Sequence, residues 1–145
     1  MLTRPSMLTN PDGLNHLTGA IIDAAITVHR ETGPGLLEAV YAECLTYELQ
    51  DRNFDVETNQ RVPLVYRGRT LMNHYFLDLR VNGKVIIELK SVSALAPIHT
   101  SQLLTYLKLT GCPVGLLLNF NVPVMKQGIK RVIRPGLDKG AGLVG

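Results

Sequence analysis

Three charged residues interrupt an otherwise apolar stretch over residues 74–91. Asp78 lies in the first half of this stretch, and Glu88 and Lys90 lie two apart in the second half. Side chains alternate along a β-strand, so Glu88 and Lys90 share one face. Asn82-Gly83, between the two halves, is a strong hairpin signal. Two carboxylates could hold a hard divalent cation such as Mg²⁺ or Mn²⁺, with the ammonium group beside it.

The register of this hairpin decides whether Asp78 joins the other two charges. A two-residue loop would set Asp78 opposite Ile87 and place the apolar side chains of one strand on the charged face of the other, which is costly. A three-residue or bulged loop puts Asp78 on the face of Glu88 and Lys90. We therefore predict a three-residue or bulged turn. The expected apolar face of the hairpin consists of Leu77, Leu79, Val81, Val85, Ile87 and Leu89.

The charge cluster is compatible with two roles. A lysine beside metal-binding carboxylates can orient a water molecule or neutralise the charge that develops on a phosphate. A structural ion pair at the rim of a sheet has the same composition. Spacing alone leaves both roles open.

Composition predicts one domain without a membrane partner. The chain has 145 residues and a net charge of +3, which is compatible with a polyanionic partner but is no evidence for one. Cys44 and Cys112 match no metal spacing, so we expect free thiols in a reducing compartment. No apolar run approaches the length of a membrane span, and the N-terminus lacks the apolar core of a signal peptide. We expect a cytoplasmic protein.

Helices and strands surround the hairpin. Apolar periodicity and Pro/Gly signals predict helices over residues 14–32, 36–50 and 97–110, and strands at 54–58, 62–66, 70–81, 114–120 and 128–133, besides the second hairpin strand. The expected buried stripe of the second helix consists of Leu37, Val40, Tyr41, Cys44, Leu45 and Leu49. We predict a leader at 1–12, one domain at 13–134 and a flexible tail at 135–145.

Other polar residues have structural explanations when spacing alone is considered. Glu38 lies in the first turn of its helix, where a carboxylate is stabilised by the helix N-terminus. Gln102 and Tyr106 lie four apart and share one helix face. Alternation places His74 on the strand face of Asp78. Two roles remain open for it: contact with a phosphate or the metal, or an ordinary surface position. A cluster of basic residues near the end of the domain is either a solvated face or a contact for phosphates. It consists of Lys126, Lys130, Arg131 and Arg134.

The order helix, hairpin, helix, strand, with Asp78 followed by Glu88-Leu89-Lys90, resembles the core of the PD-(D/E)XK nuclease superfamily. Gly35-Leu-Leu-Glu38-Ala-Val-Tyr41 resembles the signature of the small bacterial GxxExxY proteins, a branch of that superfamily. The resemblance covers roughly residues 14–132. Leu77 stands where the superfamily name has Pro, a position that varies widely. The implied fold is α/β (α+β), with a restriction-endonuclease-like core, a central mixed sheet flanked by helices and the order αβββαβ.

The resemblance implies a metal-dependent nuclease that uses Mg²⁺ or Mn²⁺. Asp78 and Glu88 would bind the metal, with the backbone carbonyl of Leu89 as a further ligand. Glu38 matches an additional acidic residue that completes the metal site in many members. For this residue, the resemblance overrides the purely structural explanation.

The remaining roles that the resemblance implies concern the reaction and the substrate. Lys90 would position the attacking water and stabilise the pentavalent transition state, and Gln102 and Tyr106 would support the active site as in RecB-like exonucleases. We expect nucleic acid as the partner, DNA rather than RNA. A catalytically weak or inactive nucleic-acid-binding module and a purely structural ion-pair network are the alternatives. A homodimer is a further hypothesis, because a small core often needs a second copy to close around a duplex.

Overall fold

The computed structural model describes residues 11–136. The predicted leader and tail lie outside the described residues except at their inner ends, and α2 begins at Pro11, where we expected leader. Proline suits the first turn of a helix, which lacks hydrogen-bond acceptors for its N–H groups. The elements are α2 (Pro11–Thr32), α3 (Glu38–Asp51), β1 (Val56–Tyr66), β2 (Arg69–Val81), β3 (Val85–Lys90), α4 (Pro97–Thr110), β4 (Val114–Asn119), η1 (Met125–Gly128) and β5 (Ile129–Ile133).

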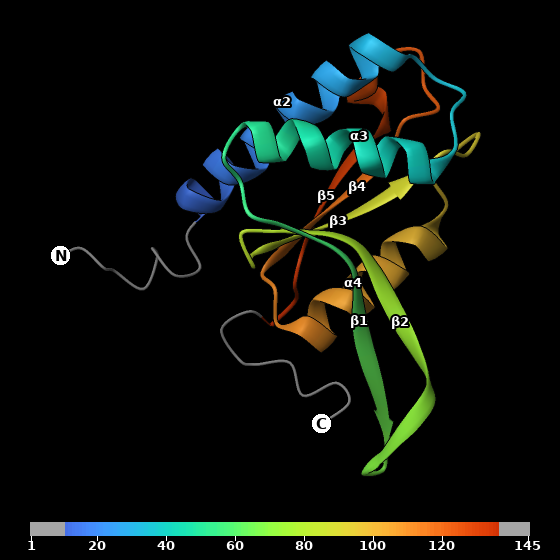
Figure 1. Ribbon diagram of the computed structural model, residues 1–145. Helices are drawn as coiled ribbons and strands as arrows, with labels where there is room; N and C mark the ends of the chain where they lie inside the picture. Colours follow the sequence, from blue (N-terminus) through green and yellow to red (C-terminus); the bar gives the residue numbers. More distant parts are fainter. Residues whose placement is uncertain (1–10, 137–145) are drawn as a thin grey trace, which may run out of the picture.

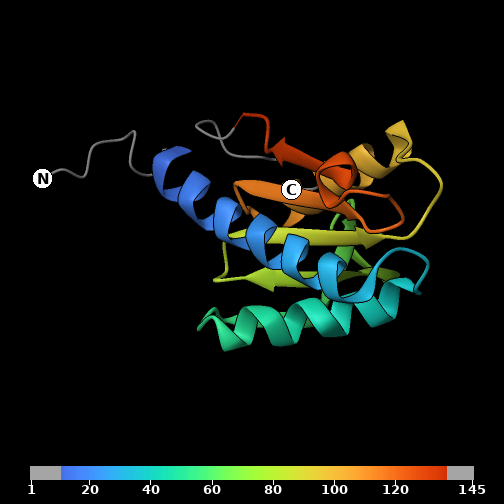
Figure 2. The same cartoon turned by 90° about the horizontal axis from the view of Figure 1, so that it is seen from above.

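One mixed sheet carries the fold, with strand order β1-β2-β3-β4-β5. The β3 and β4 strands are parallel, and the other neighbouring strands are antiparallel. Helices α2 and α3 cover one face of the sheet and α4 covers the other (Figures 1 and 2). All six residues of β4 are buried, which explains its continuous apolar sequence. The predicted α+β fold with a mixed sheet and flanking helices is confirmed.

The predicted three-residue turn of the central hairpin is confirmed. Leu79 pairs with Ile87 and Val81 pairs with Val85, which leaves residues 82–84 as the loop. Asn82 and Gly83 both have positive φ angles, 52° and 67°, and the Lys84 N–H donates to the Val81 carbonyl at 2.9 Å. Asn and Gly are the residues that adopt this backbone conformation most readily.

The prediction that Leu77 shares one apolar face with Leu79 is wrong. Leu79 packs in the core under α2 and α3, whereas Leu77 packs against α4 on the other face of the sheet. Between them, the β1–β2 ladder skips Asp78 and the opposite residue Asn59, which has a φ of 49°. A left-handed residue in a strand bends it and increases its twist, as in a β-bulge. The hairpin therefore passes from one helical layer to the other at Asp78.

Two strands predicted on either side of residue 60 form the single strand β1, which pairs along its length with β2. Beyond Asn59, this strand pair leaves the sheet and projects past α4 (Figure 1). We call residues 60–77 of this hairpin the arm.

The buried stripe of α3 is narrower than predicted. Tyr41, Leu45 and Leu49 are buried, but Leu37 and Val40 are 74% and 40% exposed. Leu37 precedes the helix with an extended backbone, so the helical period does not apply to it. Among the described helices, none combines the length and the apolar character that a membrane span requires.

Candidate active site

Asp78 and Glu88 lie at the point where the β2–β3 ladder ends, and each carboxylate binds the backbone of the other strand. Asp78 Oδ2 accepts a hydrogen bond from the Leu89 N–H at 2.9 Å. Glu88 Oε1 accepts one from the Asp78 N–H at 3.3 Å. The last ladder pair before them is Leu79 with Ile87. The two carboxylates thus take the place of backbone acceptors, and the strands separate around them.

Burial and mutual repulsion disfavour the charged form of this pair. Glu88 is only 8% exposed, and burial, followed by the negative charge of Asp78, raises its pKa from 4.5 to about 8. Burial also raises the pKa of Asp78, with a smaller contribution from the charge of Glu38. A bound cation would relieve both effects, because it stabilises the deprotonated form of each carboxyl group.

Lys90 follows two residues after Glu88 at the end of β3. Its charge lowers the pKa of Asp78 and of Glu88, but less than burial raises them. Within the described part of the chain, Lys90 forms no ion pair. Its backbone carbonyl accepts a hydrogen bond from the Phe120 N–H at 3.0 Å, which fixes the strand end. The ammonium group is therefore near the carboxylates without being neutralised by a direct contact.

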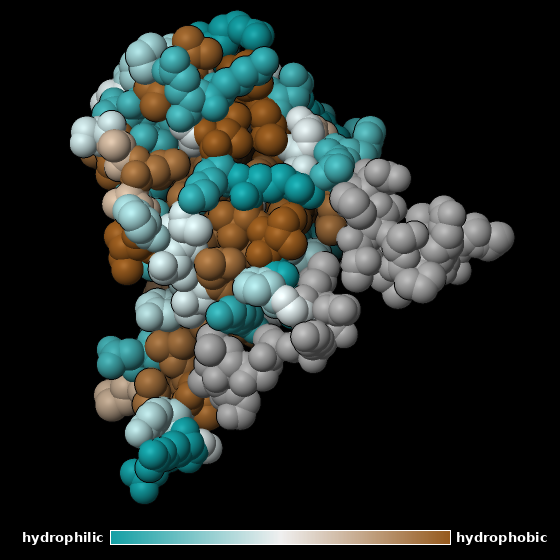
Figure 3. Space-filling view, turned by 180° about the vertical axis from the view of Figure 1, so that it is seen from behind, coloured by the Kyte–Doolittle hydropathy of each residue, from teal (hydrophilic) through white to brown (hydrophobic). Residues whose placement is uncertain are grey.

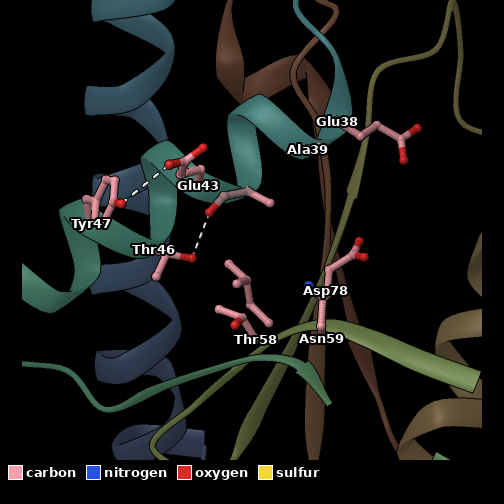
Figure 4. A pocket seen from close by; sticks show the side chains of 10 residues that line it. Glu38, Ala39, Glu43, Thr46, Tyr47, Thr58, Asn59 and Asp78 are labelled. Carbon is pink, nitrogen blue, oxygen red and sulfur yellow. Dashed lines mark hydrogen bonds between the residues drawn. The ribbon is translucent and has the colours of Figure 1, made fainter. Parts of the chain in front are cut away.

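Glu38 reaches the same site from the first turn of α3. Its Oε2 accepts a hydrogen bond from the Ser91 N–H at 3.3 Å, and Ser91 Oγ donates to the Leu36 carbonyl at 2.7 Å. Figure 4 shows the Glu38 and Asp78 carboxylates pointing into one space. Ser91 links the end of β3 to the start of α3, a role that the sequence analysis missed. Its position directly after Lys90 was the available signal.

Tyr41 explains the end of the Gly-x-x-Glu-x-x-Tyr pattern. Its ring is fully buried and stacks on Phe120, with centroids 4.4 Å apart. Its hydroxyl donates to the Gly33 carbonyl and accepts from the Leu36 N–H. These bonds fix the loop immediately before Glu38. Tyr41 is therefore a residue that positions the site from beneath.

Two predicted site residues, Gln102 and Tyr106, lie on α4. Tyr106 lies close enough to Asp78 and Glu88 for their charges to affect its pKa. Burial raises its pKa to about 12, and the negative charges of Glu88 and Asp78 add to this shift. The phenol is therefore neutral and can donate a hydrogen bond. Gln102 is exposed one turn earlier, and its side chain makes no hydrogen bond to any residue that the structure describes. A supporting role for Gln102 stays a prediction.

A pocket of about 510 Å³ opens beside the carboxylates, between α3 and the β1–β2 strands (Figure 4). Glu38 and Asp78 line the same pocket as Glu43 and Tyr47, which come from the middle of α3. The remaining lining residues are Ala39, Ala42, Thr46, Thr58, Asn59 and Leu79. The floor of the pocket is the bent part of β1 and β2, so the bend both separates the strands and opens the site.

The donor set fits a hard cation with open coordination positions. Among residues 11–136, no three His, Cys, Asp or Glu side chains lie together as a complete metal site. Asp78 and Glu88 supply two carboxylates, and Glu38 faces them. Each uses one oxygen on a backbone N–H and leaves the other without such a donor. Mg²⁺ is commonly held by one or two carboxylates, with waters and substrate phosphates completing its shell.

Comparison with known proteins supports this description. The sequence model of the PD-(D/E)XK nuclease superfamily matches residues 15–132, a span that contains every site residue discussed above. Searches of curated proteins and of solved structures gave no significant match.

Proposed function

Because the chain belongs to the PD-(D/E)XK nuclease superfamily, we propose that it hydrolyses phosphodiester bonds of nucleic acid with Mg²⁺ or Mn²⁺, and that DNA rather than RNA is its substrate. We also assign it to the GxxExxY branch, on the pattern Gly35, Glu38 and Tyr41. The reciprocal bonding of Asp78 and Glu88 at the opened strand pair carries the proposal. It gathers two hard oxygen donors beside a lysine and a pocket.

Asp78 and Glu88 would hold the metal ion, with the Leu89 carbonyl and Glu38 as further oxygen donors. When bound, the ion supplies Lewis-acid stabilisation of charge on the phosphate oxygens. The two carboxylates are held in place by the Leu89 and Asp78 N–H groups, so they need little reorganisation to accept a cation.

Lys90 would orient the attacking water and stabilise the extra negative charge of the pentavalent transition state. Its ammonium group has no carboxylate partner among the described residues, so its charge is available to a substrate phosphate. Tyr106 remains protonated at neutral pH and can donate a hydrogen bond to a phosphate oxygen. Gln102 would add a second donor on the same helix face.

The test is cleavage of labelled DNA and RNA with Mg²⁺, with Mn²⁺ and with EDTA. Glu88→Ala and Lys90→Ala should each lower the cleavage rate by roughly 100- to 1,000-fold, the usual cost of losing one transition-state contact. The matched controls are Glu57→Ala and Lys84→Ala, which remove one exposed charge of each sign. Normal metal-dependent cleavage by either site variant would show that the assigned centre is wrong.

A catalytically inactive nucleic-acid-binding module is the second candidate. The observation that favours it is the burial of Glu88, which raises the pKa of this carboxyl group to about 8 and so disfavours its deprotonated, metal-binding form near neutral pH. Binding of nucleic acid by the wild-type protein, with no cleavage in Mg²⁺ or Mn²⁺, would establish this alternative.

Two further proposals concern the setting of the protein. Free Cys44 and Cys112 agree with a reducing compartment, and we place the protein in the cytoplasm. We also propose a homodimer, since a compact single-domain core offers little surface to enclose a nucleic acid by itself. Light scattering on the purified chain gives the mass in solution and tests the dimer directly.

A further inference from the structure

The arm, residues 60–77, is fixed to the body of the protein through one face only. Leu77 and Val62 are buried in the core beneath α4, and Tyr75 meets Tyr106 edge-on with ring centroids 5.4 Å apart. Alternation then directs the neighbouring side chains to the opposite face. The arm therefore presents that second face outward from a rigid base.

Aromatic and cationic side chains occupy the outer face near its base. Phe76 pairs across the strands with Arg61, and His74 pairs with Pro63. Phe76 is 54% exposed, although it is a large apolar ring. His74 meets it edge-on with centroids 4.9 Å apart, and the His74 Nδ1–H donates to the Met72 carbonyl. These contacts hold the Phe76 ring in place while more than half of its surface stays exposed.

The charge on the arm has one sign. Residues 58–77 include three arginines and no aspartate or glutamate. Arg67 lies over the Tyr66 ring at the tip, 5.4 Å from its centroid. Seen from behind, the arm carries apolar side chains above a hydrophilic tip (Figure 3). Exposed rings among arginines are suited to a partner that offers both flat π-faces and negative charge.

The arm is continuous with the active site. Phe76 lies only two residues before Asp78 on β2, about 7 Å along the strand. The pocket beside Asp78 includes Thr58 and Asn59, which lead directly into the arm on β1. A chain bound along the outer face would therefore run toward the carboxylate pair.

We propose that the outer face of the arm binds the unpaired nucleotides of a single-stranded segment, with a base stacked on Phe76 and a phosphate at Arg61. The proposal rests on the proposed nuclease function and specifies its substrate class. Stacking on an exposed ring requires an accessible base face, which a duplex hides within its own stack. The basic arm matches the phosphate charge, whereas two copies of the same arm would repel each other.

The experiment measures binding apart from cleavage. Fluorescence anisotropy in EDTA compares a labelled oligothymidylate with a blunt duplex, each about twenty nucleotides long, enough for the binding sites typical of stacking grooves. Phe76→Ala should weaken binding of the oligothymidylate by roughly 5- to 150-fold, the usual effect of losing one stacked base. Phe76→Tyr should keep the wild-type affinity, and Phe76→Leu should behave like Phe76→Ala, because leucine is apolar but has no π-face.

Val124→Ala is the matched control, because Val124 is an exposed apolar residue in the loop after β4. Equal oligothymidylate affinity in wild type and Phe76→Ala would overturn the inference, as would equal affinity of Phe76→Leu and wild type or preference for the duplex. A dimer in light scattering that Phe76→Ala dissociates, without a change in affinity, would reassign the face to a second copy. Cleavage that still depends on Glu88 would leave the proposed function standing in each of these cases, whereas absence of both binding and cleavage in wild type would remove both.

Discussion

At the scale of single residues, Glu88 has the environment least suited to its charge. It is buried, it adjoins Asp78, and its carboxylate is satisfied by one backbone N–H. A sequence can place it two residues before Lys90 on a strand face. The raised pKa of Glu88 cannot be predicted from the sequence, because it comes mainly from burial, which depends on how the helices pack around the strand.

This environment predicts the pH dependence of stability without metal. The pKa of Glu88 rises from 4.5 to about 8 on folding, so the folded state binds the proton more tightly than the unfolded state. The resulting stability is fully present below pH 4.5 and is lost as the pH rises through about 8. In EDTA, the melting temperature of wild type should fall between pH 5 and 9, and that of Glu88→Gln should fall by at least about 4 °C less. Differential scanning calorimetry checks this, and parallel curves would contradict it.

Asp78→Asn makes a related prediction at a pH above the pKa of Glu88, where both carboxyl groups carry charge. The amide keeps an oxygen for the Leu89 N–H but removes one of two repelling charges. We expect the metal-free variant to melt at a higher temperature than wild type, because the repulsion with Glu88 is gone. The measurement is thermal unfolding in EDTA at pH 9, where Glu88 is charged as well. An unchanged or lower melting temperature would mean that charge repulsion is not the dominant cost at this position.

At the scale of elements, the sequence predicted the hairpin loop correctly and the course of β2 beyond Asp78 incorrectly. The loop follows from pairing, because only an odd length brings apolar side chains together. The bend follows from the left-handed Asn59, which no local pattern distinguishes from any other asparagine in a strand. Alternation alone would put Leu77 and Leu79 on one face, but the twist between them carries Leu77 to the other core.

Tyr41 gives a prediction about how α3 positions Glu38. Tyr41→Phe keeps the ring on Phe120 but removes the hydroxyl that bonds to the Leu36 N–H and the Gly33 carbonyl. We expect the free energy of unfolding to fall by about 1–3 kcal/mol, the usual net contribution of two hydrogen bonds at about 0.5–1.5 kcal/mol each. Urea unfolding measures it, and cleavage should slow as the loop before Glu38 loosens.

The control for this variant is Tyr47→Phe. Tyr47 is exposed on the same helix, and its hydroxyl bonds only to the side chain of Glu43 at 3.4 Å. Its loss should change the free energy of unfolding by less than about 0.5 kcal/mol, as for most surface substitutions. Equal effects of the two variants would remove the positioning role from Tyr41.

At the scale of the whole molecule, the fold agrees with membership in the nuclease superfamily. The outline of this fold could be predicted from the sequence. The buried β4 strand and the helix at Pro97 follow from local signals, and the flanking of the sheet by helices was implied by the family resemblance. The projection of the arm does not follow from such signals, because it depends on how far β1 and β2 extend beyond α4. The sequence does not distinguish the arm's exposed aromatic residues from ordinary strand residues, because aromatic residues are common in strands.

Metal binding should be detectable as stabilisation of the entire domain. A ligand that binds only the folded state raises the melting temperature, by an amount equivalent to about 2.7 kcal/mol at one hundred times its dissociation constant. We expect Mn²⁺ to raise the melting temperature of wild type and to leave that of Asp78→Asn almost unchanged. Thermal-shift titration of both proteins side by side provides the measurement. Equal shifts in the two would exclude Asp78 from the metal site.

The mutual bonds of Asp78 and Glu88 also bear on the order of folding and metal loading. Because each carboxylate already accepts a hydrogen bond from a backbone N–H of the opposite strand, these two bonds connect the separated strands without a metal ion. Zinc fingers are not held together in this way without metal, and they unfold when their metal is removed. This protein should instead complete its fold during synthesis without waiting for a cation. Loss and recovery of the ion would then be a local exchange at a finished site, readily reversed by a chelator and leaving the surrounding sheet intact.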